Sequence, residues 1–199
     1  CATRRLLWRR ASSPVAVCEP SAKPSASATS SPSRWAPPTT PTSSKPLVKT
    51  VNFKNDGNVQ RFDFPLEKEQ NAEVTFSAPL RYLYEPNAAL LKAGAFRSVA
   101  AFFQISKIAP HSHLYTSTDL IAHFPGRVFE ILATVKADVK ALSPYITDAK
   151  ANLTLRNFPG TTDELRKKLK RKDGGVVYLL ATTLANGDKR LLVCRKAKR

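Results

Sequence analysis

Hydrophobic and polar residues alternate in short runs in the part of the chain that begins near Val51. Two β-prone runs within residues 51–64 flank the segment KNDGN, and Asp-Gly between such runs favours a hairpin turn. The alternation within residues 73–78 (EVTFSA) predicts a further strand. We therefore expect the folded part of the chain to begin with strands.

A longer and largely apolar stretch at residues 86–103 predicts a helix, with Pro86 at the first helical position. The polar residues of this stretch do not fall on one stripe. A helix that is apolar nearly all round is buried on more than one side. Gly94 lies in its interior, where glycine costs about 1 kcal/mol relative to alanine. We therefore expect Gly94 to mark a close backbone approach.

The pattern is clearest from Phe124 onward, where it predicts the order β-α-β-α-β-β. In the first strand, residues 128–135, we expect Phe129, Ile131, Ala133 and Val135 to share one face. The later elements are a helix at 138–149 interrupted near Pro144, a strand at 152–158 with Leu153 and Leu155 inward, a helix at 161–170 with a Thr161–Glu164 capping box, an apolar central strand at 176–184, and a hairpin at Asn186-Gly187 with a returning strand at 191–194. Parallel crossovers joined to a terminal hairpin make a small α+β sheet with helices on one side.

Residues 1–48 have a different composition, dominated from residue 11 by Ser, Pro, Thr and Ala. Such a segment cannot bury enough apolar surface to offset its chain entropy, so we expect disorder. A flexible linker or tail, a transit peptide and an out-of-frame or foreign segment all remain open. The expected organisation is a disordered tail (1–48), a strand-and-helix segment (49–125) and the β-α-β-α-β-β module (126–199).

The chain carries a net charge of +17, of which residues 1–50 contribute +7 and residues 51–199 contribute +10. The segment TTDELRKKLKRK places six cations around two apolar anchors, Leu165 and Leu169, and we see no carboxylate spaced to pair with these cations. A solvated helix with good dipole complementarity is one interpretation. So many cations on one short helix favour a polyanion, with RNA as the preferred ligand.

The expected RNA contacts come from this helix, the strand before it and the terminal hairpin. Lys and Arg neutralise phosphates, which gives affinity with little sequence readout. For Arg156, a strand residue facing solvent and a phosphate contact fit equally well. The predicted RNA-binding residues are Arg156, Arg166, Lys167, Lys168, Lys170, Arg171, Lys172, Lys189 and Arg190, and Arg195, Lys196, Lys198 and Arg199 add charge to the same module.

The cysteine content indicates the redox state of the cellular compartment, and the length of the apolar runs shows whether a membrane-spanning helix is predicted. The three cysteines, Cys1, Cys18 and Cys194, are too few and too scattered for a disulfide framework or a thiolate zinc site. A reducing compartment, the cytoplasm, is therefore expected. The chain has no run of about 18 apolar residues, so no membrane-spanning helix is predicted.

Catalytic motifs are sparse in this sequence. It has no P-loop, GxSxG, HExxH or GxGxxG-type loop. An enzyme that uses His111, His113 and Asp119 is a weak alternative, because His123 is distant and metal sites need converging ligands. Structural histidines are the favoured interpretation, and no metal site is predicted. The residues alone indicate a binding module.

Three stretches resemble a known family: YLYEPNAALLKAGAF (82–96), HLYTSTDLIAHFPGRVFEI (113–131) and ANLTLRNFPGTTDELRKKLKRKDGGVVYLLATTL (151–184). They are similar to the C-terminal region of bacterial THUMP-like-domain class I methyltransferases that depend on S-adenosylmethionine. The resemblance covers roughly residues 51–197. It implies a ferredoxin-like segment at 49–125 and a THUMP-like domain at 126–199.

In that family the catalytic Rossmann domain lies N-terminal to both segments, and no such domain is found in this sequence. The chain begins at Cys1 and contains no Met, so we expect a fragment without catalytic activity of its own. The resemblance implies an accessory role in presenting RNA (tRNA or rRNA), with S-adenosylmethionine serving the parent enzyme and no cofactor on this chain. The alternative is a docking module that packs against the missing methyltransferase domain or another protein. The sequence does not give the oligomeric state.

Overall fold

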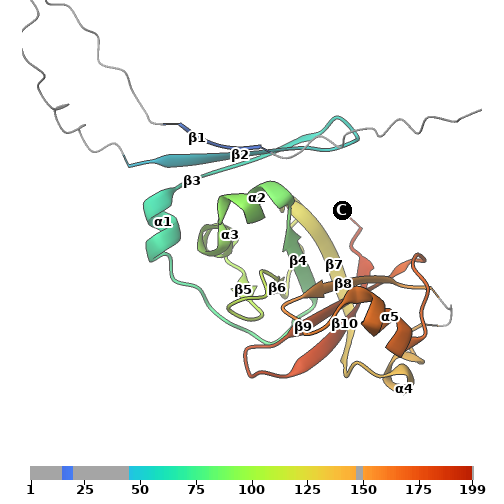
Figure 1. Cartoon of the computed structure of the whole chain (residues 1–199). Helices are drawn as coiled ribbons and strands as arrows, with labels where there is room; N and C mark the ends of the chain where they lie inside the picture. Colours follow the sequence, from blue (N-terminus) through green and yellow to red (C-terminus); the bar gives the residue numbers. More distant parts are fainter. Residues whose placement is uncertain (1–14, 20–44, 147–149, 199) are drawn as a thin grey trace, which may run out of the picture.

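The computed structural model describes residues 15–19, 45–146 and 150–198, and its largest element is a seven-stranded sheet (Figure 1). Neighbouring strands run antiparallel, except for the parallel pair β8 and β9. From edge to edge the strands are β5 (Ser106–Lys107), β6 (Tyr115–Ser117), β4 (Tyr82–Pro86), β7 (Gly126–Val135), β10 (Lys189–Lys196), β9 (Val177–Thr183) and β8 (Asn152–Arg156). The helices are α1 (Leu66–Asn71), α2 (Ala88–Ala93), α3 (Phe96–Phe103), α4 (Val139–Leu142) and α5 (Thr162–Leu169). The protein is α+β, as the sequence predicted.

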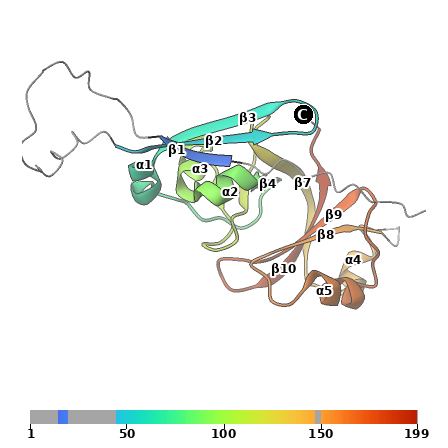
Figure 2. The same cartoon turned by 45° about the horizontal axis from the view of Figure 1, so that its top comes forward.

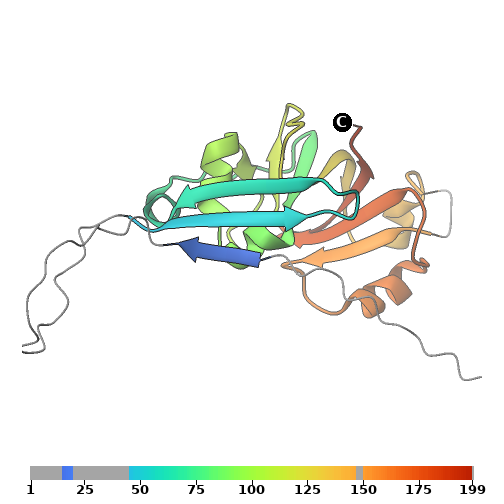
Figure 3. The ribbon, with the colours of Figure 1, turned by 90° about the horizontal axis from the view of Figure 1, so that it is seen from above.

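A separate three-stranded antiparallel sheet lies over α2 and α3 (Figures 1 and 3). It consists of β1 (Val15–Glu19), β2 (Leu47–Phe53) and β3 (Val59–Pro65). The predicted hairpin is confirmed, because β2 and β3 are paired and Gly57 in their turn has a φ of 79°. β1 lies within the segment expected to be disordered, and pairing with β2 is a long-range contact that composition does not report. The other residues of that segment up to residue 44 lie outside the described residues.

The apolar stretch at residues 86–103 forms two short helices, so the prediction of one continuous helix is wrong. Pro86 ends β4, and the Asn87 side chain caps α2 by accepting a hydrogen bond from a backbone N–H at 3.0 Å. Gly94 ends α2 with a φ of 71°, the left-handed conformation typical of a helix C-cap. An added Cβ on Gly94 would meet no atom within 4 Å, so this glycine does not mark a close approach.

Residues 73–78 do not form the predicted strand. They run beside β5 and make a single isolated bridge, between Phe76 and Lys107, within the described part of the chain. Two backbone hydrogen bonds flank the bridge, from Lys107 N to Thr75 O at 2.9 Å and from Ser77 N to Lys107 O at 3.0 Å. Because β5 itself is only two residues long, the pairing ends there.

The C-terminal part has the predicted order, β7-α4-β8-α5-β9-β10, with β9 in a central position. The capping box is present, since Thr161 and Glu164 each accept a hydrogen bond from the other's backbone N–H. Leu153 and Leu155 pack against the core beneath the helices, as expected. α4 is only four residues long and ends before Pro144, so the long helix predicted there is wrong; residues 147–149 lie outside the described part.

A β-bulge in β7 corrects the predicted strand face. The register with β10 shifts, because Val193 pairs with Ala133 whereas the next residue, Cys194, pairs with Ile131. Leu132 is therefore an extra residue on β7, and an extra residue reverses the facing of everything beyond it. Ala133 consequently packs with the helices α4 and α5, whereas Ile131 packs on the opposite face of the sheet.

Three apolar clusters occupy the interior. The first joins the three-stranded sheet to α2 and α3, and includes Phe64, Leu90 and Tyr84. The second lies under α4 and α5 and includes Leu142 and Leu169, which puts both helices on one side of the sheet, as predicted (Figure 1). The third fills the other face of β7, β9 and β10 and joins the two halves of the chain through Leu83, Ile108 and Leu114.

Candidate nucleic-acid interface

Helix α5 and residues 170–172, which follow it, carry six of the nine predicted RNA-binding residues, and the helix is held by its apolar edge. Leu165 and Leu169, spaced i and i+4, are 6% and 0% exposed and face the sheet. The acidic residues Asp163 and Glu164 occupy the first turn, and the basic residues occupy the last, which matches the helix dipole. The structure therefore exposes Lys167 and Lys168 of α5, whereas Arg166 is half-buried.

Two of the arginines in the predicted set are ion-paired. Arg166 contacts Asp163 at 3.1 Å and Asp173 at 3.2 Å, and Arg190 contacts Asp188 at 2.7 Å. The expectation that no carboxylate is spaced to pair with the cations of α5 is therefore wrong. Asp163 precedes Arg166 by three residues, which is one helical turn, and Asp173 follows where the chain turns back.

Arg156 also has a carboxylate partner, which neither interpretation of this residue included. Its guanidinium lies 2.6 Å from Glu85, a β4 carboxylate that is only 3% exposed. The second Glu85 oxygen accepts a hydrogen bond from Arg127 Nε at 2.6 Å. β4 and β8 are separated by three strands in the sheet, so the contact shows that the sheet curls back on itself. Arg156 thus ties the two halves of the chain together.

The lysines of the predicted set are different. Lys167, Lys168, Lys170, Lys172 and Lys189 are all exposed, and none forms a salt bridge with any residue that the structure describes. Lys168 of α5 and Lys189 of β10 line the same groove of about 300 Å³, at the end of α5 that Thr161 caps. The fold therefore brings together two lysines that are 21 residues apart in the sequence. Arg171 is half-buried.

A second group of cations lies at the far end of the sheet. The β2–β3 turn lies near the C-terminus (Figure 2). Lys54 from this turn lines a groove of about 460 Å³ together with Arg127, Lys196 and the carboxylate Asp56. Arg195, which sequence reasoning grouped with α5, is instead paired with Glu130 at 2.8 Å, and this hydrogen-bonded contact lowers the pKa of Glu130. Lys54 was missed as a candidate, because only the strand pairing brings it near the end of the chain. Arg199 lies outside the described residues.

The histidines do not form a metal site with Asp119. His111 and His113 lie in a turn before β6 and not on a strand. His113 has a φ of 50° and stacks on Phe96, with ring centroids 3.9 Å apart. No group of three or more potential metal ligands occurs in the described ranges. Burial, followed by the nearby charge of Lys107, lowers the pKa of His113.

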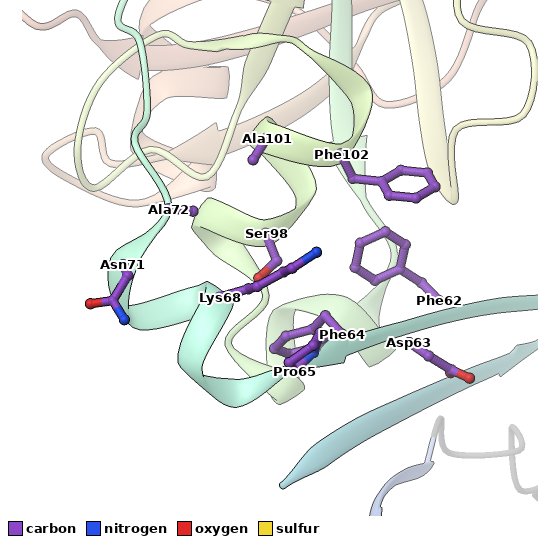
Figure 4. Close-up of a pocket in the computed structure, with 10 residues that line it drawn as sticks. All are labelled: Phe62, Asp63, Phe64, Pro65, Lys68, Asn71, Ala72, Ser98, Ala101 and Phe102. Atoms are coloured by element: carbon purple, nitrogen blue, oxygen red, sulfur yellow. The ribbon is translucent and has the colours of Figure 1, made fainter. Parts of the chain in front are cut away.

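An apolar pocket of about 520 Å³ opens between β3, α1 and α3 (Figure 4). Phe62 and Phe64 form one wall, and Phe102, which is 70% exposed, stands at the rim. Ser98 also lines the pocket; it is 4% exposed, and its Oγ has no hydrogen-bond partner among the described residues. An exposed aromatic ring beside a concave apolar wall is typical of a contact surface.

Comparisons with known proteins match two domain families to the chain. Residues 82–125 match the model of a ferredoxin-like domain, and residues 126–196 match that of a THUMP-like domain. Among solved structures, a protein from Porphyromonas gingivalis W83 that is provisionally assigned as a methyltransferase matches with a TM-score of 0.65 and 38% sequence identity. The match covers 71% of this chain and 36% of that protein. No curated protein matches the chain significantly.

The chain therefore carries a ferredoxin-like domain followed by a THUMP-like domain, and the resemblance to THUMP-like-domain methyltransferases is confirmed. It spans about a third of the length of the methyltransferase-assigned structure. No helix in the described part of the chain combines the length and the apolar character needed to cross a membrane.

Proposed function

We propose that this chain is the RNA-binding accessory region of an S-adenosylmethionine-dependent RNA methyltransferase that acts on tRNA or rRNA in the cytoplasm. The observation that carries the proposal is the surface of exposed lysines on a THUMP-like domain. This lysine surface comprises Lys167, Lys168, Lys170, Lys172 and Lys189. Because no carboxylate offsets the charge of these ammonium groups, they are available to bind phosphates. Each phosphate contact releases counterions from the nucleic acid.

The arginines of the predicted set have a supporting role in this proposal. Arg166 and Arg190 are already held by aspartates, and Arg156 is held by buried Glu85. A paired guanidinium contributes less to the potential at the surface than a free ammonium does. We therefore assign RNA contact to the lysines, and we assign to these arginines the task of fixing the elements that carry them.

The parent enzyme would use S-adenosylmethionine, but the described residues do not fit this cofactor. Nucleotide-type ligands are commonly held where a glycine-rich turn leads from a strand into a helix. In this chain the helices that follow β4 and β8 begin at Asn87 and Thr161, whose side chains already accept hydrogen bonds from the first-turn N–H groups. No step of methyl transfer is therefore assigned to residues of this chain.

RNA binding by the full chain, measured across a salt series with total tRNA and with rRNA, tests the proposal. The triple variant Lys167→Ala, Lys168→Ala, Lys189→Ala should weaken binding at low salt. It should also reduce the slope of log affinity against log salt by about 2 to 3, since each lost phosphate contact contributes about 0.7 to 0.9.

The matched control removes three exposed lysines from the other half of the chain, Lys45→Ala, Lys68→Ala and Lys92→Ala. Its net charge equals that of the first variant, so a purely non-specific attraction would affect both variants equally. We expect the control to retain most of the wild-type slope. Equal losses in the two variants, or wild-type binding that does not depend on salt, would contradict the proposal.

A second candidate function is docking against the methyltransferase domain of the parent enzyme. The largely apolar helix that first suggested docking is in fact two short helices, but the pocket beside Phe102 offers a specific surface (Figure 4). The methyltransferase-assigned structure has most of its length outside the matched region, so a large domain is available as the partner.

Binding of an apolar fluorescent dye to the full chain tests whether this surface is open. The change Phe102→Ser should reduce dye binding, because the ring is 70% exposed and its loss removes the rim of the pocket. The change Val176→Ser, at another exposed apolar residue outside the pocket, serves as the control. Equal dye binding by wild type and Phe102→Ser would remove the basis for docking at this pocket.

A further inference from the structure

The ferredoxin-like domain contains a buried lysine without a counter-ion. Lys107 is only 6% exposed, and it forms no salt bridge with the residues that the structure describes. Its Nζ donates one hydrogen bond, to Pro110 O at 2.7 Å, although an ammonium group has three donors. Burying a charge without a partner is costly, and buried charges in proteins are normally paired. Lys107 therefore has the properties of one half of an ion pair.

A groove with room for an anionic ligand lies beside Lys107. Lys107 lines a groove of about 780 Å³, within the size range of small-molecule sites, together with Arg97, His111 and His113. These four side chains come from α3, β5 and the turn before β6 and line one groove, where the Arg97 guanidinium also donates a hydrogen bond to Gln70 O at 3.3 Å. The Nδ1 atom of His113 is buried and has no hydrogen-bond partner among the described residues. Because this atom is closed to solvent, only Nε2 of His113 can contribute, beside Lys107, Arg97 and His111, to an oxyanion site in the groove.

Two carboxylates also line the groove, and the nearer one is already engaged. Both oxygens of Glu69 accept hydrogen bonds from the first backbone N–H groups of α3, at 3.0, 2.7 and 2.8 Å. Glu69 thereby caps that helix, and its charge is satisfied by backbone donors. Glu73 is exposed and pairs with no cation of the groove in the described structure. Burial lowers the pKa of the Lys107 ammonium and the charge of Glu69 acts against that lowering, but no carboxylate of the described residues lies within salt-bridge distance of Nζ.

Aromatic rings at the same groove narrow the class of ligand. Phe96 stacks on His113 and lines the groove, and Phe76, which is 50% exposed, stands at its rim. Exposed aromatic rings next to cations are the combination that holds a nucleobase and its phosphate. We propose that this groove binds a nucleotide, with the phosphate between Lys107, Arg97 and His113 and the base against Phe76.

The site is independent of the lysine surface. The groove at Lys107 shares no lining residue with the groove between Lys168 and Lys189. Its cations lie in the ferredoxin-like domain and part of its lining, including Phe76, comes from residues 69–76 before that domain, whereas the lysine surface lies in the THUMP-like domain. A free nucleotide and a nucleotide of bound RNA offer the same phosphate and base, so the test has to include both sources.

Nuclear magnetic resonance of the histidine imidazoles in the full chain is a direct test, because the chain has only three histidines. The probes are inorganic phosphate, adenosine monophosphate, adenosine without phosphate, and a five-nucleotide RNA. Resonances of His111 and His113 should move in a saturable way with adenosine monophosphate, with the RNA or with both, whereas His123, which does not line the groove, should not. Response to the monophosphate identifies a free-nucleotide site, and response to the RNA alone identifies a contact with bound RNA. Adenosine should bind at least tenfold more weakly than its monophosphate.

The change Lys107→Met should lower affinity for the responding probe at least tenfold while the protein remains folded, since Met keeps the chain length and removes the buried charge. The control Lys92→Met removes an exposed lysine of α2 and should leave affinity unchanged. Binding that survives Lys107→Met, or the absence of any saturable shift at His113, would overturn the proposal. Salt-dependent binding of tRNA to the lysine surface should be retained in Lys107→Met, so this result and that of the RNA-binding test are separate.

Discussion

The two halves of the molecule use basic residues in opposite ways. In the THUMP-like half, the lysines of α5 are exposed and lie next to arginines that are already paired. In the ferredoxin-like half, Lys107 is buried in a groove and has no carboxylate partner in the described structure. An exposed ammonium keeps its hydration and can attract any phosphate chain, whereas a buried one requires a specific partner. The comparison separates a general affinity surface from a candidate specific site.

The same seven-stranded sheet connects these two halves. The first question is therefore whether the halves fold independently or as one unit. β4 of the ferredoxin-like half pairs with β7 of the THUMP-like half. Glu85 of β4 in turn holds both Arg127 and Arg156. If the halves fold as one unit, damage at this junction will destabilise both the lysine surface and the groove at Lys107.

The largest effect is expected from Gly126→Ala at the start of β7. An added Cβ would lie 2.1 Å from the backbone oxygen of Glu85 and 2.8 Å from the ring of Phe124. Since the first contact is with backbone, β4 and β7 must move apart, and we expect a loss of about 3 kcal/mol in the free energy of unfolding. Urea unfolding followed by circular dichroism measures it, and one shared transition would show that the halves unfold together.

The control for this change is Gly187→Ala in the β9–β10 turn. Gly187 has a φ of 85° and no atom within 4 Å of an added Cβ, so only backbone strain is introduced. Its cost should be about 1 kcal/mol. A loss at Gly126 no larger than the loss at Gly187 would mean that the junction between the halves is not tightly packed.

The next effect in size is expected from Glu85→Gln. The change keeps the shape of the side chain but removes the charge that balances Arg127 and Arg156, which are 51% and 37% exposed. Because water can reach both guanidinium groups, we expect a loss of about 2 kcal/mol and not the larger value of a fully buried pair. Urea unfolding of the variant gives the value directly.

A surface ion pair provides the matched control for Glu85→Gln. Lys45 and Glu67 contact each other with side chains that are 67% and 46% exposed. The change Glu67→Gln should therefore cost no more than about 0.5 kcal/mol. Similar costs for the two variants would show that Glu85 does not link the halves more strongly than an ordinary surface pair does.

The sequence predicted those features that depend on residues close together in the chain. The Thr161–Glu164 capping box, the turn at Asn186-Gly187 and the anchors Leu165 and Leu169 are local patterns, and all are present. Gly94 shows the limit of such patterns. The same local sequence is compatible with a helix interior and with a C-cap, and the preceding strand, which ends at Pro86, decides between them.

The features that the sequence did not predict depend on contacts between residues that are distant in the chain. The bulge at Leu132 follows from the register with β10, which lies about 60 residues further along the chain. The pairing of Arg156 with Glu85 joins residues 71 positions apart, and the groove at Lys107 combines residues from α1, α3 and the turn before β6. Lys167 and Lys168 are exposed because a short amphipathic helix sets their orientation, whereas only the fold shows that Lys107 is buried.

The smallest effect is expected from Asp188→Asn, which tests the difference between paired arginines and exposed lysines. The hydrogen bond from Arg190 lowers the pKa of the Asp188 carboxyl below its usual value. A lowered folded-state pKa gives stability that is present above the unfolded value of about 3.8 and is lost as the pH falls through the folded-state value. The urea midpoints of wild type and Asp188→Asn should therefore differ slightly at pH 7 and converge below pH 4. The control Asp138→Asn, whose side chain makes no cap hydrogen bond, should match the wild type at both values. Asp188→Asn also frees Arg190, which lies next to Lys189 in the sequence. The slope of log affinity for RNA against log salt should therefore rise by at most one phosphate contact, about 0.7 to 0.9. A larger rise would mean that the aspartates of this domain restrain RNA binding, and that its arginines belong with the lysines.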